Sequence, residues 1–401
     1  MNMEYLKSKP IAVIGGGATG RTQAADCTLA GREVRLYELP EYASALGTIL
    51  KNREITIVPC EQPNLYGFNR QGTAKVSMVS TDMAEVMKGA GLVVISLPAV
   101  GFKTVFERLI PHLEDGQVIH FMTGNFGSLI LRKMMREAGS KAKVIIGEWT
   151  SQPYGCRVST FGGVQMPSVW LTYRAITLRG AAFPSRDQAA FFESAKYLPT
   201  MDSVRHPVEG DTVVDIGFSN VNPILHVPGT LLGVSTMENF GLVFGDDKKK
   251  FSIYSHAFCP SISEVQYAVY LEERKIAEAM GVGIQPFEKE EFFSRTNVLG
   301  SEFMGPGCAI PFDEEAPFAY GTGPFSVMNR YVTEDIPVGC HIFYQLAQKF
   351  GVDVPIITAM IHLGNIMTKQ DFFKTGLTLA DLGLADMDKD QIGRYLREGA
   401  A

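Results

Sequence analysis

The first half of the chain alternates short apolar runs with segments of helical spacing. Apolar runs rich in β-forming residues occur at residues 11–14, 33–37, 75–79, 92–96, 117–121 and 144–146. Helical patterns lie between several of them, at residues 21–30, 83–88, 102–112 and 129–137. Runs that are apolar throughout predict strands covered on both faces, as in a parallel sheet flanked by helices. We therefore predict an α/β domain with a doubly wound, mainly parallel sheet.

The pattern of apolar residues changes after about residue 200, where the periodic segments become longer and have helical spacing. Ser261 and Glu264 have the spacing of a capping box, and apolar residues then continue at near-helical spacing until Gly281, a plausible helix end. Further helices are expected at residues 337–350, from about residue 355, and at 388–398. We predict an all-α second domain, with domains at residues 1–203 and 204–401.

A glycine-rich motif follows the first predicted strand. Gly15, Gly17 and Gly20 fill the positions of G-x-G-x-x-G, with Ala18 and Thr19 between the last two. The first glycine permits a tight turn, the second a close approach of the backbone to a pyrophosphate, and the third close packing of helix and strand. An amphipathic helix is expected next, with its N-terminal N–H groups directed at the phosphates. This context predicts a Rossmann domain that binds a nicotinamide dinucleotide.

An acidic residue ends the second predicted strand. Glu38 lies close to the roughly 20-residue offset at which an acid binds the adenosine ribose. A carboxylate there suits the hydroxyl groups of NAD and repels the 2′-phosphate of NADP. No arginine follows directly, but Arg21 and Arg35 are near in sequence, so NAD is preferred and NADP stays open.

The loop after the strand at residues 92–96 lies where a doubly wound sheet places its ligand crevice. Leu97 and Pro98 could line the nicotinamide side of the site. An ordinary strand-to-helix loop explains the same residues equally well.

Two segments of the second half carry candidate catalytic chemistry. Asn222 and His226 would face the same way on a helix, and an imidazole suits proton transfer near neutral pH. A histidine satisfied inside a core is the competing interpretation. Arg330 offers a planar fork for a carboxylate, and Asp335 could orient a histidine ring. Ordinary capping of a helix N-terminus explains the residues at 333–335 equally well.

Composition narrows the class of protein. The 401 residues include 37 basic and 43 acidic side chains, giving a net charge of -6 with both signs mixed, so nothing indicates nucleic-acid binding. The N-terminus has no apolar stretch of signal-peptide length, and no apolar stretch approaches the length of a membrane span. The cysteines and histidines are scattered, which predicts neither a disulfide framework nor a metal site. We expect a cytoplasmic protein. The basic run at residues 248–250 and the acidic residues Asp313, Glu314 and Glu315 are read as solvated surface.

Over essentially its whole length the sequence resembles the opine dehydrogenases, including the octopine and nopaline dehydrogenases. The matching pieces are the glycine motif, the segment at residues 148–157, the pair Asn222 and His226 followed by Pro228-Gly229, and Arg330-Tyr331 followed by Glu334-Asp335. The last two carry most of the specificity. The resemblance implies a Rossmann domain followed by a helical domain. It also implies reductive condensation of an amino acid with a 2-oxo acid, using NADH or NADPH.

The resemblance further implies roles for individual residues. His226 would be the general acid and base, paired with Asp335, while Arg330 would hold a substrate carboxylate and Asn222 would support the site. Near this position the family has a glutamine, and the resemblance implies that Asn125, with a shorter side chain, takes its place as a substrate contact. Glu148 and Arg157 align with no defined role, and a homodimer is left open.

Two other classes of function remain alternatives. A 3-hydroxyacid or glycerol-3-phosphate type of dehydrogenase shares this domain order, but such enzymes commonly use a lysine as the acid and base, and the segment around His226 has none. A non-catalytic NAD(H)-binding redox sensor would keep Gly15–Gly20 and Glu38 without needing the histidine, arginine and aspartate of the second half.

Overall fold

The computed structural model describes residues 3–58, 70–245, 247–287, 289 and 322–399. The chain forms two compact units: the first ends at Val213, the second is Val214–Gly393, and the chain returns to the first from Arg394 onward. This division falls later than the predicted boundary between residues 203 and 204. It also gives the last helical turn to the first unit, because that turn packs there, as the contact of Tyr395 with Phe183 shows.

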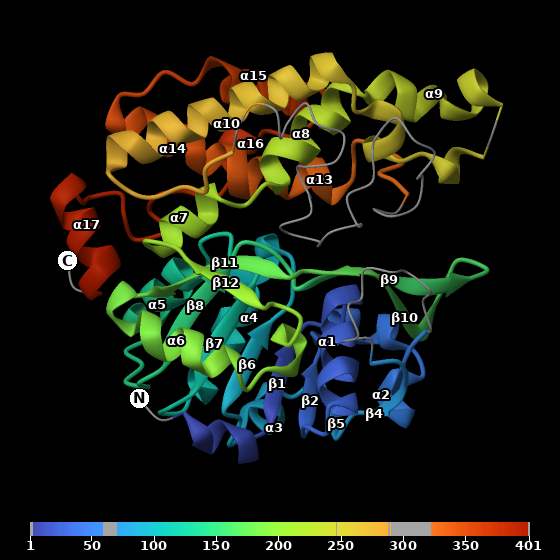
Figure 1. Ribbon diagram of the computed structural model, residues 1–401, viewed down its shortest axis with the longest axis vertical. Helices are drawn as coiled ribbons and strands as arrows, with labels where there is room; N and C mark the ends of the chain where they lie inside the picture. Colours follow the sequence, from blue (N-terminus) through green and yellow to red (C-terminus); the bar gives the residue numbers. More distant parts are fainter. Residues whose placement is uncertain (1–2, 59–69, 246, 288, 290–321, 400–401) are drawn as a thin grey trace. The chain divides into compact units, whose positions relative to one another are not determined.

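An eight-stranded sheet forms the centre of the first unit (Figure 1). Its strand order is β12-β11-β8-β7-β6-β1-β2-β5, and every neighbouring pair from β8 to β5 is parallel. The pairing of β11 with β8 is antiparallel, and β12 runs parallel to β11, so these two strands run opposite to the other six. The bounds are β1 Ile11–Ile14, β2 Val34–Tyr37, β5 Met78–Ser80, β6 Leu92–Ile95, β7 Val118–Met122, β8 Ile145–Trp149, β11 Thr177–Phe183 and β12 His206–Glu209. The predicted doubly wound sheet is confirmed.

Helices cover the sheet in the order that right-handed crossovers require. The crossover from β1 to β2 passes through α1 (Ala18–Leu29), and those from β5 to β8 pass through α3 (Met83–Met87), α4 (Phe102–Leu109) and α5 (Gly127–Glu137). The strand order reverses between β1 and β6, so α1 lies on one face and the other three helices on the opposite face. The reversal places the crevice of the sheet beside the glycine motif.

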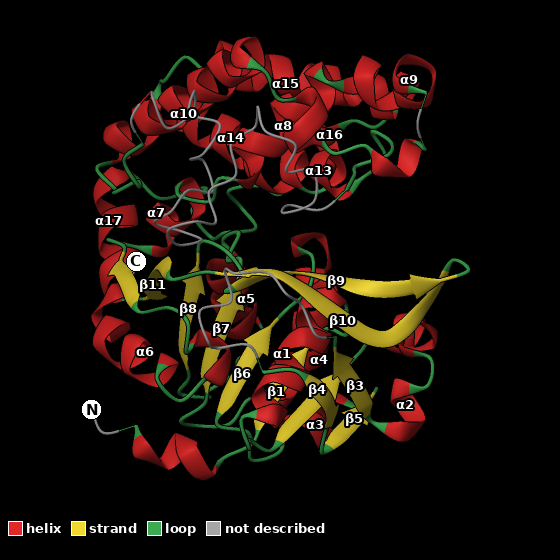
Figure 2. Ribbon diagram, turned by 45° about the vertical axis from the view of Figure 1, so that its right-hand side comes forward, coloured by secondary structure: helices red, strands yellow, loops and turns green. Residues whose placement is uncertain are grey.

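A second sheet, which the apolar pattern did not predict, covers the outer side of α1. Its order is β4-β3-β10-β9, with β3 Glu54–Ile57, β4 Gly72–Lys75, β9 Tyr154–Phe161 and β10 Val164–Arg174. The hairpin of β9 and β10 is the long yellow ribbon that extends from this unit in Figure 2. Because α1 contacts both sheets, every side of its middle is enclosed, and residues 20–27 are all buried. The expectation of an amphipathic helix here is wrong for that reason.

One predicted strand, at residues 75–79, is divided between the two sheets. Lys75 ends β4 in the small sheet, and Met78 begins β5 in the large one. Between them the chain leaves one ladder and joins the other, with the N–H of Val76 donating to Arg53 O at 2.8 Å. An apolar run predicts burial but cannot indicate which sheet buries each residue.

The second unit is helical, as predicted. It contains α8 (Asn222–Leu232), α9 (Val234–Phe244), α10 (Pro260–Met280), α13 (Arg330–Thr333), α14 (His341–Phe350), α15 (Pro355–Thr368) and α16 (Phe372–Thr375). The two units are joined through α7 (Val213–Phe218) and α17 (Lys389–Glu398). Helix α8 is in contact with α10, α13 and α15, and residues 223–231 are buried. Helix α8 is therefore the buried helix against which α10, α13 and α15 pack.

Two short π-helical segments interrupt the helices around α8. The first, η9, spans Ile253–Ala257, and the second, η10, spans Asp335–Cys340. Both contact α8. A Cβ on Gly339 of η10 would stand 2.5 Å from Cγ of Pro223, so glycine permits this close approach. The predicted helix at residues 337–350 is thus a π-turn followed by α14.

The predicted capping box at Ser261 and Glu264 is wrong. The N-cap of helix α10 is Cys259, two residues before Ser261, so the helix begins at Pro260 and has no side-chain capping bond. Proline is favoured in the first turn because its missing N–H would have no partner there. The predicted end is right, since Gly281 adopts the left-handed conformation at the C-cap.

No helix among the described residues is both long and apolar enough to cross a membrane.

A buried ionic cluster ties α1 to the second sheet. Asp26 is fully buried in α1, and its carboxylate accepts from Arg174 at 2.7 Å and from Arg70 at 2.9 Å. Arg174 is also fully buried and lies over the ring of Tyr154, while Arg70 reaches the half-exposed Asp202 at 2.7 Å. The negative charge of Asp26 on the enclosed helix is therefore neutralised by the guanidinium groups of Arg174 and Arg70.

Asp26→Ala is expected to lower the free energy of unfolding by about 3–5 kcal/mol, because it leaves a buried guanidinium without its carboxylate. Chemical denaturation followed by circular dichroism measures this change. Asp202→Ala is the matched control, and removing its exposed carboxylate should cost less than about 1 kcal/mol. Equal losses in the two variants would contradict the assignment of Asp26 as the central charge.

Candidate cofactor and catalytic sites

The glycine loop of the first unit is built by backbone contacts that only glycine permits. Gly15 has φ of 110°, and a Cβ there would stand 2.5 Å from Ser96 O. A Cβ on Gly20 would overlap Gly15 O, so α1 approaches the end of β1 as closely as backbones can. Gly17 is exposed, with no atom near the position of a Cβ, and it caps α1 without a side-chain hydrogen bond.

This loop fits a dinucleotide pyrophosphate. The first N–H groups of α1 have no side-chain cap, and Ala18 and Thr19 are only partly buried. Free N–H groups and the positive end of the helix dipole attract phosphate oxygens. The open space at Gly17 leaves room for that approach. The fit therefore rests on this backbone geometry rather than on the motif alone.

Glu38 stands beside the same loop. Its carboxylate accepts from the N–H of Gly16 at 2.9 Å and from its neighbour Leu39 at 2.8 Å. Each oxygen then has one backbone partner, and a carboxylate can accept about four hydrogen bonds. Two acceptor positions remain for ribose hydroxyls, while the glycine loop is held in register with β2.

The two arginines near the motif are engaged by other groups. Arg21 is buried in α1, and its guanidinium donates to the carbonyls of Gly16 and Ala45 at 2.8 and 2.7 Å. Arg35 donates to Glu33 at 2.9 Å and to Lys88 O at 2.6 Å. Both guanidinium groups thus serve local structure.

Leu97 and Pro98 lie in the loop that packs on the glycine motif. Leu97 Cβ would stand 3.3 Å from a Cβ on Gly15, and Pro98 is exposed at the cap of the next turn. Their predicted contact with the nicotinamide stays a prediction.

A buried carboxylate supports the loop that carries Asn125. Glu148, fully buried in β8, accepts from the N–H of Ser128 at 2.7 Å, from the N–H of Phe126 at 3.1 Å, and from the Ser128 hydroxyl. Burial raises the pKa of the Glu148 carboxyl to about 7, against the opposing effect of these donors. Thr123, Asn125 and Phe126 all adopt positive φ, which costs about 1–2 kcal/mol each for the threonine and the phenylalanine and less for the asparagine. Glu148 thus holds a strained loop at the end of β7, a role that its sequence position did not reveal.

The second unit brings His226 and Asp335 together. His226 lies on α8 and Asp335 begins η10, and Nδ1 of the ring is 2.7 Å from Oδ2 of the carboxylate. Both side chains are only 10% exposed. A carboxylate at Nδ1 selects the tautomer that carries its proton there and leaves Nε2 as the reactive nitrogen. The chain segments that sequence analysis selected thus meet in one site.

Two tyrosines complete the surroundings of the imidazole. The hydroxyl of Tyr254, on η9, is 3.0 Å from Nε2 of His226. The ring of Tyr331 stacks on the imidazole, with centroids 3.7 Å apart and planes 8° apart. Sequence analysis missed Tyr254, because no local pattern links a tyrosine on a π-turn to a histidine on another helix. Tyr331, next to Arg330, belonged to a selected segment but had no assigned role.

Arg330 extends from α13 one turn before Asp335. Its side chain is 66% exposed, and its guanidinium pairs with the nearly buried Glu334 at 2.9 Å. The spacing of four residues on consecutive turns is the signal that could have predicted this pair. A guanidinium has five donors, so Arg330 can keep Glu334 and still bind a second carboxylate.

Asn222 is the first residue of α8, one turn before His226, so the two share a face of the helix as predicted. Its N–H donates to Asn220 Oδ1 at 3.1 Å. Its support of catalysis stays a prediction, as does the substrate contact of Asn125. Asp313, Glu314 and Glu315 lie outside the described residues. Among the described residues, no group of three or more histidine, cysteine or acidic side chains could hold a metal ion.

The sequence is similar to known proteins over most of its length. The family model described as NAD/NADP octopine/nopaline dehydrogenase, alpha-helical domain, matches residues 209–368. An opine dehydrogenase of Arthrobacter sp. (strain 1C) is 25% identical over 389 residues, which cover 95% of this chain and 97% of the relative. These matches support the opine dehydrogenase family: the model covers the helical region, and the relative is similar over almost the whole chain.

Solved structures show the same fold. Octopine dehydrogenase with NADH and L-arginine has a TM-score of 0.67 at 17% identity, covering 96% of this chain and 97% of the other. The same enzyme with NADH and pyruvate has a TM-score of 0.63 at 17% identity, covering 90% and 89%. Yersinopine dehydrogenase with NADP+ has a TM-score of 0.65 at 11% identity, covering 98% of each chain.

The comparisons confirm the enzyme class that the sequence predicted. The protein is an NAD(P)-dependent dehydrogenase of the type that acts on CH–NH bonds. The 3-hydroxyacid, glycerol-3-phosphate and redox-sensor alternatives are not favoured.

Proposed function

We propose that this opine dehydrogenase condenses an amino acid with a 2-oxo acid and reduces the product to a secondary-amine dicarboxylate, and that it also runs the reverse reaction. The observation that carries the proposal is the pair of His226 and Asp335 one turn from Arg330, in the helical unit of this family. The overall reaction consumes one hydride and one proton and releases one water. It therefore needs a site that moves protons and holds carboxylates.

The imidazole of His226 supplies the proton transfer. Asp335 holds the proton of Nδ1, so the exchangeable proton is given and taken at Nε2. Protonating the oxygen that leaves as water is one use of this group, and accepting a proton from the incoming amine is another. The carboxylate of Asp335 stabilises the imidazolium that exists between these steps.

Arg330 orients a substrate carboxylate. Its exposed guanidinium remains able to form a two-point contact while Glu334 holds its position. A fixed carboxylate holds the reacting carbon in one orientation within reach of His226. The substrate then loses little further translational and rotational freedom on the way to the transition state. Asn222, on the same helix face as His226, supports the site.

Gly15, Gly17, Ala18, Thr19 and Gly20 hold the pyrophosphate of the nicotinamide cofactor, Glu38 holds the adenosine ribose, and Leu97 and Pro98 line the nicotinamide side. The bound cofactor supplies the hydride. We infer a preference for NADH, because the Glu38 carboxylate repels a 2′-phosphate and both nearby guanidinium groups are already engaged. Octopine dehydrogenase binds NADH and yersinopine dehydrogenase binds NADP+, so the family accommodates both.

The remaining features of the proposal concern partners and compartment. Pyruvate is the first 2-oxo acid to test, since octopine dehydrogenase binds it, and Asn125 is the proposed additional substrate contact. Among the described residues, Cys27, Cys156, Cys259 and Cys340 form no disulfide, as in a reducing compartment such as the cytoplasm. Cys60 and Cys308 lie outside the described residues. A homodimer stays a prediction.

The reaction is tested by NADH oxidation with 2-oxo acids, pyruvate and 2-oxoglutarate foremost, each with and without a panel of amino acids. Absorbance at the nicotinamide band follows the rate, and mass spectrometry identifies the product. We expect oxidation only when both partners are present, with a secondary-amine dicarboxylate as product. Oxidation with a 2-oxo acid alone would contradict the proposal and indicate a hydroxyacid dehydrogenase.

His226→Ala is expected to lower kcat by about 10²–10⁴-fold, the usual contribution of a positioned acid and base. NADH affinity should be nearly unchanged, because the cofactor residues belong to the first unit. Steady-state kinetics and fluorescence titration of NADH measure the two effects. His362→Ala, on the exposed side of α15, is the matched control. Normal turnover of His226→Ala would exclude His226 as the proton carrier.

Glu38→Ala is expected to raise the Kd for NADH by roughly 10-fold, since hydrogen bonds to a charged group are lost. The Kd for NADPH should rise less, because repulsion of its phosphate is lost as well. Glu33→Ala, just before the same strand begins, is the control that removes an exposed carboxylate. Unchanged NADH affinity in Glu38→Ala would refute the ribose assignment.

A further inference from the structure

Neither ring nitrogen of the catalytic imidazole is open. Nδ1 of His226 is bound to Asp335 at 2.7 Å, and Nε2 is 3.0 Å from the hydroxyl of Tyr254. With the proton of the neutral ring on Nδ1, the lone pair of Nε2 accepts from the tyrosine hydroxyl. A proton that enters or leaves His226 at Nε2 therefore meets Tyr254 first.

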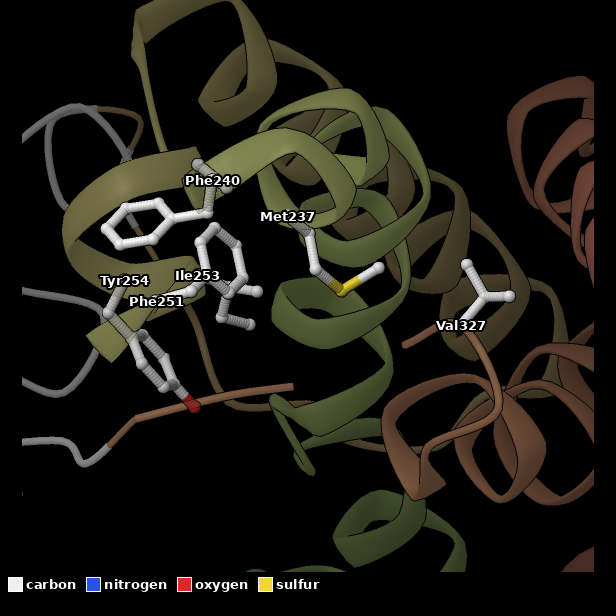
Figure 3. Close-up of a cluster of buried hydrophobic side chains, with 7 residues drawn as sticks. Met237, Phe240, Phe251, Ile253, Tyr254 and Val327 are labelled. Atoms are coloured by element: carbon white, nitrogen blue, oxygen red, sulfur yellow. The ribbon is translucent and has the colours of Figure 1, made fainter. Parts of the chain in front are cut away.

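Tyr254 cannot easily turn away from this position. Its ring belongs to a buried cluster with Phe240, Phe251 and Ile253, and it meets the ring of Phe258 edge-on at 5.3 Å. Figure 3 shows its hydroxyl pointing away from the side chains of Met237 and Phe240. Only 7% of the residue is exposed. The apolar end thus anchors the tyrosine while its polar end reaches His226.

The imidazole itself is held on its face as well as on its edges. The stacked ring of Tyr331, 3.7 Å from centroid to centroid, sets the plane of His226. Asp335 and Tyr254 fix the two nitrogens within that plane. Rotation about either side-chain bond of His226 would break at least one of these contacts.

The backbone gives a second, independent observation. Asp335 and Tyr254 both lie on π-helical segments, η10 and η9, although most helical residues of this unit are α-helical. Such turns are rare and frequently occur at functional sites, because they displace a side chain from its α-helical direction. The same unusual backbone therefore delivers both partners of His226.

We propose that Tyr254 is a positioning residue of the acid–base pair, so that Asp335, His226 and Tyr254 form one hydrogen-bonded chain for the protons of the reaction. When His226 becomes protonated, Nε2 donates to the tyrosine oxygen instead of accepting from its hydroxyl. The proton that His226 gains comes from the reacting substrate, the tyrosine keeps its own hydroxyl proton and stays neutral, and the hydrogen bond between the two side chains reverses its direction. This inference rests on the proposed function, because it gives His226 the role of proton carrier.

Tyr254→Phe tests the proposal in the full-length protein, because phenylalanine keeps the ring in its apolar cluster. We expect kcat to fall roughly 10- to 100-fold, as for the loss of a hydrogen bond to a group that becomes charged. The KM values of both substrates and the Kd of NADH should stay within about twofold. Tyr270→Phe is the matched control: it removes another buried-ring hydroxyl of this unit, one bonded to the backbone of Gln285 and Phe287. That control should leave kcat unchanged.

A double-mutant cycle shows whether Tyr254 acts through His226. In the His226→Ala background, Tyr254→Phe should have no further effect on kcat, because the group it serves is gone. Full additivity of the two losses would overturn the proposal, as would wild-type kcat in Tyr254→Phe alone.

A spectroscopic readout separates this inference from the proposed function. In protein labelled with ¹⁵N-histidine, the signals of His226 are those that disappear in His226→Ala. Its Nε2 resonance should move in Tyr254→Phe and stay in place in Tyr270→Phe. An unmoved resonance would overturn the inference even if the enzyme condenses its substrates. A wild-type protein inactive with every substrate pair would refute the proposed function while this contact is still measured.

Discussion

The helical unit is organised around one hydrogen bond, between Nδ1 of His226 and Oδ2 of Asp335. Both groups are nearly buried, so this bond gives the Asp335 carboxylate and Nδ1 of His226 the polar partner that burial requires. The bond joins α8, the helix that the others pack against, to the π-turn η10. Gly339 permits the close approach of these segments, and Asp335 then lies one turn from Arg330. Packing of the unit and chemistry of its site therefore depend on the same contact.

In the first unit the proposed phosphate site is formed by backbone groups, whereas the site of the helical unit is formed by side chains. Close contact between Gly20 and Gly15 places the N-terminus of α1 at the end of β1, where its N–H groups have no side-chain cap. That helix is enclosed by two sheets, and Arg174 and Arg70 neutralise the buried carboxylate of its Asp26. An enclosed helix cannot shift easily, which keeps the phosphate-binding end in place.

Several features of the fold followed from local patterns, and others depended on long-range pairing. The parallel strands were predicted because strands covered on both faces are apolar throughout. The small sheet was not predicted, since its partners β3, β4, β9 and β10 come from distant parts of the chain. The same pairing explains why residues 75–79 divide between two sheets and why α1 is buried on all sides. Burial by a later segment leaves no periodic signal in the earlier one.

The sequence by itself determined the glycine motif, the acid at the end of β2, and the segments that carry His226, Arg330 and Asp335. These features depend on residue type and on spacing within one turn or one strand, which local sequence contains. The resemblance implied the pair of His226 and Asp335, but only the tertiary structure decided that the carboxylate meets Nδ1, that Tyr254 meets Nε2, and that Tyr331 covers the ring. Each of these contacts joins segments far apart in the chain. Hydrogen bonds at such separations are set by helix packing, and a sequence records the donors and acceptors without recording which of them meet.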